Sequence, residues 1–233
     1  NRIWKATNAI LALAIFLGSL LISGSFKKFV LLGLGTIFAF ALANFFFIRK
    51  VAKSGLDYLP LVLPLIFLIS LFGTIAATSS MTVRFFLALV GAFLIFLYQK
   101  YFPHHAPLLV EEAISLSAGF LALIMIWSIN FFFTPAWWLL SLLIFIIFFP
   151  VFIQAFYKMG RPWLDCFLLS LVSGLIMVEI TWATFFMPVY FLTAAVIGFA
   201  AFYLMYILSS LYFASRLSLK KVYFQTILIF LVV

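Results

Sequence analysis

Glu179 is the residue of this 233-residue chain with the clearest chemical potential, because it interrupts a long apolar run. A carboxyl group in such a run could bind a proton or a cation, which is the chemistry of a transport site. Its neighbours on the same helical face are all apolar, namely Val172, Leu175, Ile176, Trp182, Ala183 and Phe186. We therefore expect Glu179 to face a helix bundle or a wet cavity, or to carry a proton, because facing lipid is costly.

A structural role is the competing interpretation of Glu179. Its carboxyl group could form a hydrogen bond with a neighbouring helix, with Asn130 as the candidate partner, or its side chain could extend outward to the membrane surface. One acid without a basic partner in the sequence does not define a proton site. Glu179 and Asn130 are therefore candidates for an intramembrane polar or ion site.

Two histidines and two acids form the group that comes closest to a metal-ligand set. His104 and His105 stand seven residues before Glu111 and Glu112, and imidazole and carboxylate groups can bind zinc. The segment lacks a standard ligand spacing and contains two prolines. The histidines are weak candidates, and we expect a polar loop with no metal and no cofactor.

Catalysis by a nucleophile is not supported by the remaining side chains. Ser173 lies in an apolar run that has no histidine or lysine to activate it. Cys166 is the single cysteine, so it cannot form an intrachain disulfide, and it could be either lipidated or packed. We expect no catalytic residue and no enzymatic activity.

The composition shows which solvent these residues meet. The chain is 68% hydrophobic and 8% charged, with a mean hydropathy of +1.35, and its charges fall mainly in short gaps between apolar runs. Runs of about 20 apolar residues match the thickness of a bilayer. The formal net charge of +9 follows from basic gaps of this kind, so we expect no nucleic acid partner.

The apolar runs predict an all-α, polytopic transmembrane bundle with eight full spans. The predicted helices are 7–23, 29–48, 58–79, 85–102, 113–133, 136–157, 164–186 and 189–213. A partial ninth helix over 222–233 would rise only about 18 Å, too short to cross. The first run could alternatively be a signal peptide.

The domain prediction is one integral membrane domain over 1–233. It contains the helical hairpins 1–50, 57–103, 112–162 and 164–216, followed by the partial helix. Because the sequence begins at Asn1 and stops within an apolar run, we expect both ends to be incomplete.

The distribution of lysine and arginine predicts the orientation of the chain. With eight spans, one side receives Arg2, Lys5, Arg49, Lys50, Lys53, Lys100, Lys158, Arg161, Arg216, Lys220 and Lys221, and the other receives Lys27, Lys28 and Arg84. Cytoplasmic loops collect positive charge, so the N-terminus and the basic loops are predicted to be cytoplasmic. The expected location is a bacterial or archaeal cytoplasmic membrane.

Acidic residues other than Glu179 stand at predicted cytoplasmic helix starts. Asp57, Glu112 and Asp165, together with Glu111, are predicted to cap helix N-termini, each stabilising by a few tenths to about 1 kcal/mol. Insertion and capping thus explain nearly every charge except Glu179.

Two classes of function are compatible with this pattern. The first is a non-catalytic membrane subunit or scaffold, whose phenylalanine-rich surface contacts the lipid bilayer and other membrane protein subunits. The alternative is a transporter of a small solute or ion, or its membrane subunit, with Glu179 as a proton or cation site. A wet cavity with converging polar groups at Glu179 would favour transport, and its absence would favour a subunit.

Overall fold

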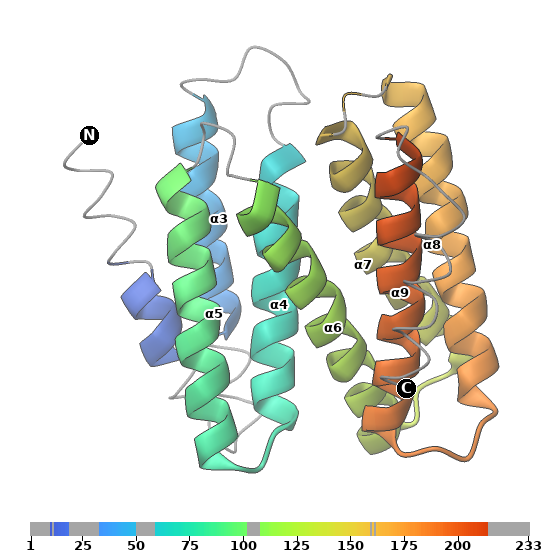
Figure 1. The fold of residues 1–233 in the computed structure, drawn as a ribbon. Helices are drawn as coiled ribbons and strands as arrows, with labels where there is room; N and C mark the ends of the chain where they lie inside the picture. The colour runs from blue at the N-terminus through green and yellow to red at the C-terminus, as the bar shows by residue number, and fades with distance from the viewer. Residues whose placement is uncertain are drawn as a thin grey trace. The chain divides into compact units, whose positions relative to one another are not determined.

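The computed structural model describes residues 10, 12–18, 33–49, 59–101, 108–158, 160 and 162–213, and these residues contain no strand. The labelled helices are α3 (Leu34–Arg49), α4 (Val62–Ala77), α5 (Met81–Tyr101), α6 (Leu108–Phe133), α7 (Trp137–Lys158), α8 (Trp163–Phe185) and α9 (Phe191–Phe213) (Figure 1). The all-helical prediction is therefore confirmed for this part of the chain.

Six of the described helices are long and apolar enough to cross a membrane. These segments are Leu59–Ala77, Met81–Lys100, Val110–Phe133, Trp137–Lys158, Trp163–Phe185 and Phe191–Ser209. Such helices are the mark of an integral membrane protein.

The predicted count of eight spans with a partial ninth is not confirmed. Helix α3 has 16 described residues, or about 24 Å of rise, which is shorter than a hydrocarbon core of about 30 Å. Most of the first predicted helix and the whole of 222–233 lie outside the described residues.

Two helices begin several residues earlier than predicted. Helix α5 starts at Met81, not residue 85: the Arg84 N–H donates to the Ser80 carbonyl at 3.1 Å, and the Val83 N–H makes a long contact of 3.5 Å with the Ser80 hydroxyl. Arg84 therefore lies in the first turn, where its Nε donates to the Thr78 carbonyl. Helix α6 starts at Leu108, five residues before the predicted 113. In both helices the first turn contains a charged residue, Arg84 in α5 and Glu111 in α6.

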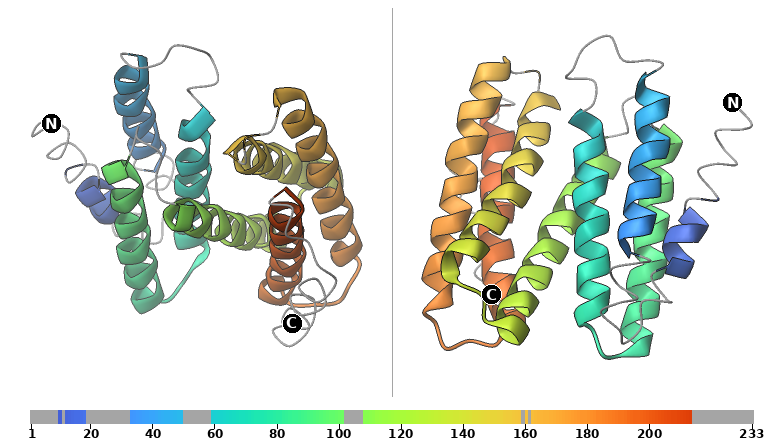
Figure 2. Two further views of the ribbon diagram at one scale, coloured as in Figure 1. Left: turned by 45° about the horizontal axis from the view of Figure 1, so that its top comes forward. Right: turned by 180° about the vertical axis from the view of Figure 1, so that it is seen from behind.

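The chain divides into two compact units, residues 1–125 and 126–233, and each is described by itself (Figure 2). The boundary falls within α6. One membrane domain over 1–233 stays a prediction.

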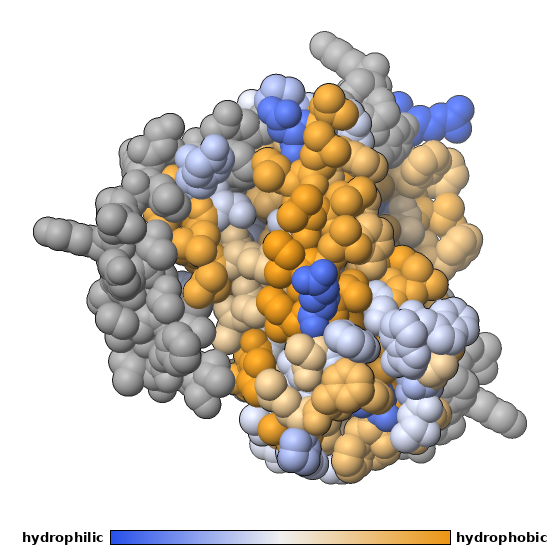
Figure 3. All heavy atoms as spheres, turned by 90° about the vertical axis from the view of Figure 1, so that its right-hand side faces the viewer, coloured by the Kyte–Doolittle hydropathy of each residue, from blue (hydrophilic) through white to orange (hydrophobic). Residues whose placement is uncertain are grey.

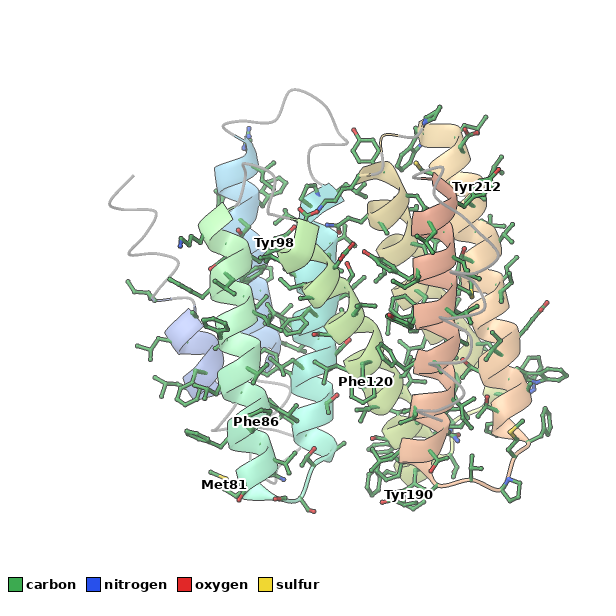
Figure 4. The ribbon with its side chains drawn as sticks, in the orientation of Figure 1. Met81, Phe86, Tyr98, Phe120, Tyr190 and Tyr212 are labelled. Carbon is green, nitrogen blue, oxygen red and sulfur yellow. The ribbon has the colours of Figure 1, made fainter. Side chains whose placement is uncertain are left out.

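Unit 1 is held by close packing and by two long-range hydrogen bonds. The Thr74 hydroxyl of α4 donates to the Leu121 carbonyl of α6 at 3.0 Å, and the Tyr98 hydroxyl of α5 donates to the Pro60 carbonyl at 2.7 Å. Figure 4 shows Met81 and Tyr98 near opposite ends of α5. The Leu71 side chain of α4 fills the space that a Cβ at Gly91 of α5 would take, so this glycine permits close approach.

In unit 2, α8 packs against both α7 and α9 (Figures 1 and 2). A Cβ at Gly174 of α8 would lie 3.2 Å from the Phe145 ring of α7, so the two helices are in close contact there. Phe148 and Phe152, which lie on the same face of α7 as Phe145 at helical spacing, pack against Phe202 of α9 with ring centroids 5.1 and 5.4 Å apart. Figure 4 shows Tyr190 and Tyr212 at opposite ends of α9.

The turn between α6 and α7 is tight. Thr134 follows the last residue of α6 with a φ of 42°, the left-handed conformation that commonly ends a helix, and its N–H donates to the Asn130 carbonyl at 3.0 Å. Pro135 comes next and cannot continue the helix. This turn brings the end of α6 next to the start of α7, where a recess forms.

Candidate functional site

Glu179 is exposed on the outer side of α8. It lies six residues before Phe185, the last residue of the helix, which is about 9 Å along the axis. Every same-face neighbour that the sequence predicted is also exposed: Val172, Leu175, Ile176, Trp182, Ala183 and Phe186. The predicted apolar stripe therefore exists, but it is an outer surface of the described part of unit 2 (residues 126–233) and does not face the interior of that unit.

The buried side of α8 lies opposite Glu179. Its residues are small, hydroxyl-bearing or sulfur-containing: Cys166, Ser170, Ser173, Gly174, Met177, Thr181 and Thr184. Three of the hydroxyls are satisfied within the helix, where Ser170 donates to Cys166, Thr181 to Met177 and Thr184 to Ile180, at 2.6 to 2.7 Å. Small residues on this side let α7 approach, as is common in membranes. No polar group of this face is directed toward Glu179, which is about half a helical turn away.

The surface over α8 and α9 is mostly apolar, with isolated hydrophilic side chains within it (Figure 3). The exposed fractions of Leu168, Val172 and Leu175 are 51%, 52% and 48%. A carboxylate in such a surface has little water to solvate it within a bilayer core, so it requires a polar partner or extension of its side chain to the membrane surface.

Asn130 lies elsewhere, in a small, open recess of about 20 Å³ between the end of α6, the start of α7 and the end of α8. The recess is lined by Ile126, Trp127, Asn130, Trp137, Leu140, Ser141, Ile144, Thr181, Trp182 and Phe185, all within unit 2. Glu179 is absent from this lining, and in the described part of the chain no hydrogen bond joins it to Asn130. The structure therefore does not bring the two candidate residues together.

Trp127 is a residue of the recess that the sequence did not single out. It is 95% buried, and its indole N–H has no hydrogen-bond acceptor among the described residues. Tryptophan usually lies near helix ends in the membrane interface, whereas Trp127 stands six residues before the end of α6. This position, away from a helix end, is the feature of the sequence that could have identified Trp127. An unsatisfied donor marks the recess as polar at one point, but its other lining is largely apolar.

The acids that were predicted to cap helices lie near N-termini where they are described. Asp165 and Glu111 are in the first turns of α8 and α6, and Glu112 is one residue further along. The N-cap of α8 is Pro162, which has no capping side chain, so Asp165 acts on the helix dipole from within the turn. Asp57 lies outside the described residues.

The weak metal candidates His104 and His105 also lie outside the described residues. The part of the chain that is described contains no group of three or more histidine, cysteine or acidic residues that could hold a metal ion. Cys166 is fully buried, as expected of a packed thiol, and Ser173 is buried in the α8 face that meets α7.

Basic residues occupy helix C-termini, where the dipole favours positive charge. Arg49, Lys100 and Lys158 lie in the last turns of α3, α5 and α7, respectively. Each therefore has a structural explanation, in contrast to Glu179.

Comparison with protein-family models, with curated proteins and with solved structures gives no match to this chain.

Proposed function

We propose that this integral membrane protein is a non-catalytic subunit or scaffold of a larger membrane complex. The observation that carries the proposal is the position of Glu179: an acid within a spanning helix, on an outer apolar face, and not among the residues that line the recess of its own unit. A carboxyl group at such a position is stabilised when another protein covers it. A transport site, by contrast, brings several polar groups together near the middle of the membrane.

The alternative of a transporter with Glu179 as a proton or cation site has weaker support. Glu179 has no hydrogen-bonding partner among the described residues, and the recess that holds Asn130 is lined mainly by apolar side chains. We therefore prefer the subunit.

The proposed topology has eight spans before residue 216, a further apolar segment from 222, and the N-terminus and basic loops in the cytoplasm of a bacterium or archaeon. Support comes from the basic last turns of α3, α5 and α7, which alternate with the last turns of α4, α6 and α8, where there is no basic residue. Single cysteines at Arg49, Lys158 and Met187, in a Cys166→Ala background, test this topology. We expect impermeant thiol reagents to label the first two from the cytoplasm and the third from outside, and labelling of positions 49 and 158 on opposite sides would overturn it.

Isolation from native membranes in a mild detergent tests the proposed function. We expect the chain to migrate as a complex with another membrane protein in fixed stoichiometry, as measured by quantitative mass spectrometry. A tagged, unrelated polytopic protein at the same expression level is the control for bystanders.

Reconstitution of the purified chain in vesicles measures the alternative directly. We expect no flux of protons or cations above that of empty vesicles. A monomeric native protein that conducts protons, with flux lost in Glu179→Gln, would overturn the proposed function and establish transport.

A further inference from the structure

The outer face of α8 has the spacing of a helix-packing seam. Its exposed residues Leu168, Val172, Leu175, Glu179, Trp182 and Phe186 follow one another at intervals of 4, 3, 4, 3 and 4. Alternating intervals of three and four place side chains on one line along a helix, in register with a second helix that winds around it at a small angle. Hereafter this set of six residues is called the α8 seam.

Glu179 is the polar residue of the α8 seam. In packed helix pairs, one polar residue in an otherwise apolar seam selects the partner, because a mismatched partner leaves it without a hydrogen bond. Inside a bilayer this selection is stronger for an acid than for an amide, since an unpaired carboxylate is costly.

The described part of unit 2 contains a single lysine or arginine, Lys158, at the C-terminal end of α7. That end lies beside the start of α8, whereas Glu179 is 16 residues further along α8, or about 24 Å. Lys158 therefore does not neutralise Glu179.

A second copy of this chain is a poor occupant of the seam. A symmetric pair would bring two Glu179 side chains to the same depth on facing helices, where like charges disfavour each other. A lysine or arginine at that depth instead supplies both opposite charge and hydrogen-bond donors.

We propose that the α8 seam binds a transmembrane helix of a different membrane protein, one that carries a lysine or arginine at the depth of Glu179. This inference rests on the proposed function and identifies its partner by chemistry. The apolar seam residues pack against the partner helix, and Glu179 pairs with its cation and fixes both partner and register.

Synthetic peptides test this proposal without knowledge of the native partner. The full chain, with a fluorescent label, is reconstituted in phosphatidylcholine vesicles with leucine-based spanning peptides of about 20 residues that carry a second label. One peptide has a lysine at the depth of Glu179, and three others have a glutamate there, a lysine near the opposite end, or leucine throughout. Association is measured by energy transfer as a function of peptide density.

We expect the peptide with the matched lysine to associate at least about tenfold more tightly than the all-leucine peptide. The glutamate peptide and the peptide with the displaced lysine should behave like the all-leucine peptide. Glu179→Leu should abolish the preference for the matched lysine. Equal association of all four peptides, or a preference that survives Glu179→Leu, would overturn the proposal.

A matched control moves the acid to another face at a similar depth. Leu142 is half exposed and lies five residues into α7, at the same end of the helix pair as Glu179. We expect the double variant Glu179→Leu/Leu142→Glu not to recover the lysine preference, because the acid is no longer in the seam. Full recovery would show that any acid at this depth suffices, and would overturn the assignment to the α8 seam.

Self-association is measured in the same vesicles with two differently labelled copies. Energy transfer between copies that depends on Glu179 would overturn the choice of a different protein as partner. These outcomes are separable from the proposed function: a stoichiometric complex from native membranes combined with peptides that do not discriminate would reject the seam and leave the subunit role intact.

Discussion

The exposed face of α8 is the more apolar one and its buried face the more polar one, which is the reverse of a surface helix in a soluble protein. The buried face contains serine, threonine, glycine and cysteine, whereas the outer face contains leucine, valine, tryptophan and phenylalanine. In lipid, apolar side chains gain little by leaving the solvent, so close backbone approach decides which side is buried. On this helix, side-chain size is therefore a better guide to burial than hydropathy, and Glu179 is the exception on the outer side.

The largest expected effect is on the buried face, at Gly174. Gly174→Leu should separate α7 from α8, because even a Cβ would lie 3.2 Å from the Phe145 ring and 3.5 Å from the Phe149 Cβ. We expect a loss of about 3 kcal/mol in the free energy of unfolding, measured by denaturation in mixed micelles. Val172→Leu on the outer face is the control and should change little, and equal losses for both variants would contradict the difference between the faces.

The next effect concerns Glu179 on the outer face. Glu179→Leu should make insertion of the segment 163–185 more favourable by about 1 to 2 kcal/mol, somewhat less than for a charge at the helix centre. Translocon-dependent insertion of this segment, flanked by reporter glycosylation sites, measures the change. Glu179→Gln should improve the free energy of insertion by a smaller amount. If neither variant inserts more favourably than the native segment, the carboxyl group does not oppose insertion and the account of this face is contradicted.

A smaller effect separates two kinds of buried hydroxyl. Thr74 of α4 donates to a carbonyl of α6, whereas Thr181 of α8 donates to a carbonyl in its own helix. Thr74→Val should cost about 1 kcal/mol of unfolding free energy, because an interhelical bond is lost, and Thr181→Val should cost less. If Thr181→Val cost more unfolding free energy than Thr74→Val, the hydrogen bond within α8 would contribute more to stability than the bond between α4 and α6, contrary to our expectation.

The smallest effect is expected from trimming the α8 seam in the isolated protein. Leu175→Ala should change the unfolding free energy by less than about 0.5 kcal/mol, because the side chain is half exposed. Ile144→Ala, in the buried face of α7, should cost about 2 kcal/mol or more and serves as the comparison.

Some of these features could be predicted from the sequence because they depend on local pattern. The length of the apolar runs predicted helices close to the observed α7, α8 and α9, and helical periodicity predicted the stripe around Glu179. The direction of that stripe could not be predicted. Leu175 and Ile147 are both apolar, yet one is exposed and the other is buried, because burial between membrane helices depends on which neighbour is close.

The recess at Asn130 was also beyond prediction. Its lining joins residues up to 59 positions apart, from Ile126 to Phe185, through the turn at Thr134 and the packing of α7 on α8. The sequence indicated Asn130 as a polar residue of the span, but its separation from Glu179 follows from the rotation of each helix about its axis.

An accessibility scan along α8 tests the central claim most directly. Nitroxide labels are placed one at a time at positions 168 to 182 of the purified chain, in a Cys166→Ala background, and collisions with dissolved oxygen are measured in bilayers. We predict maxima at 168, 172, 175 and 179 and minima at 170, 173, 177 and 181. Uniform accessibility, or maxima at the second set, would contradict an outer face that is open to lipid or to a partner.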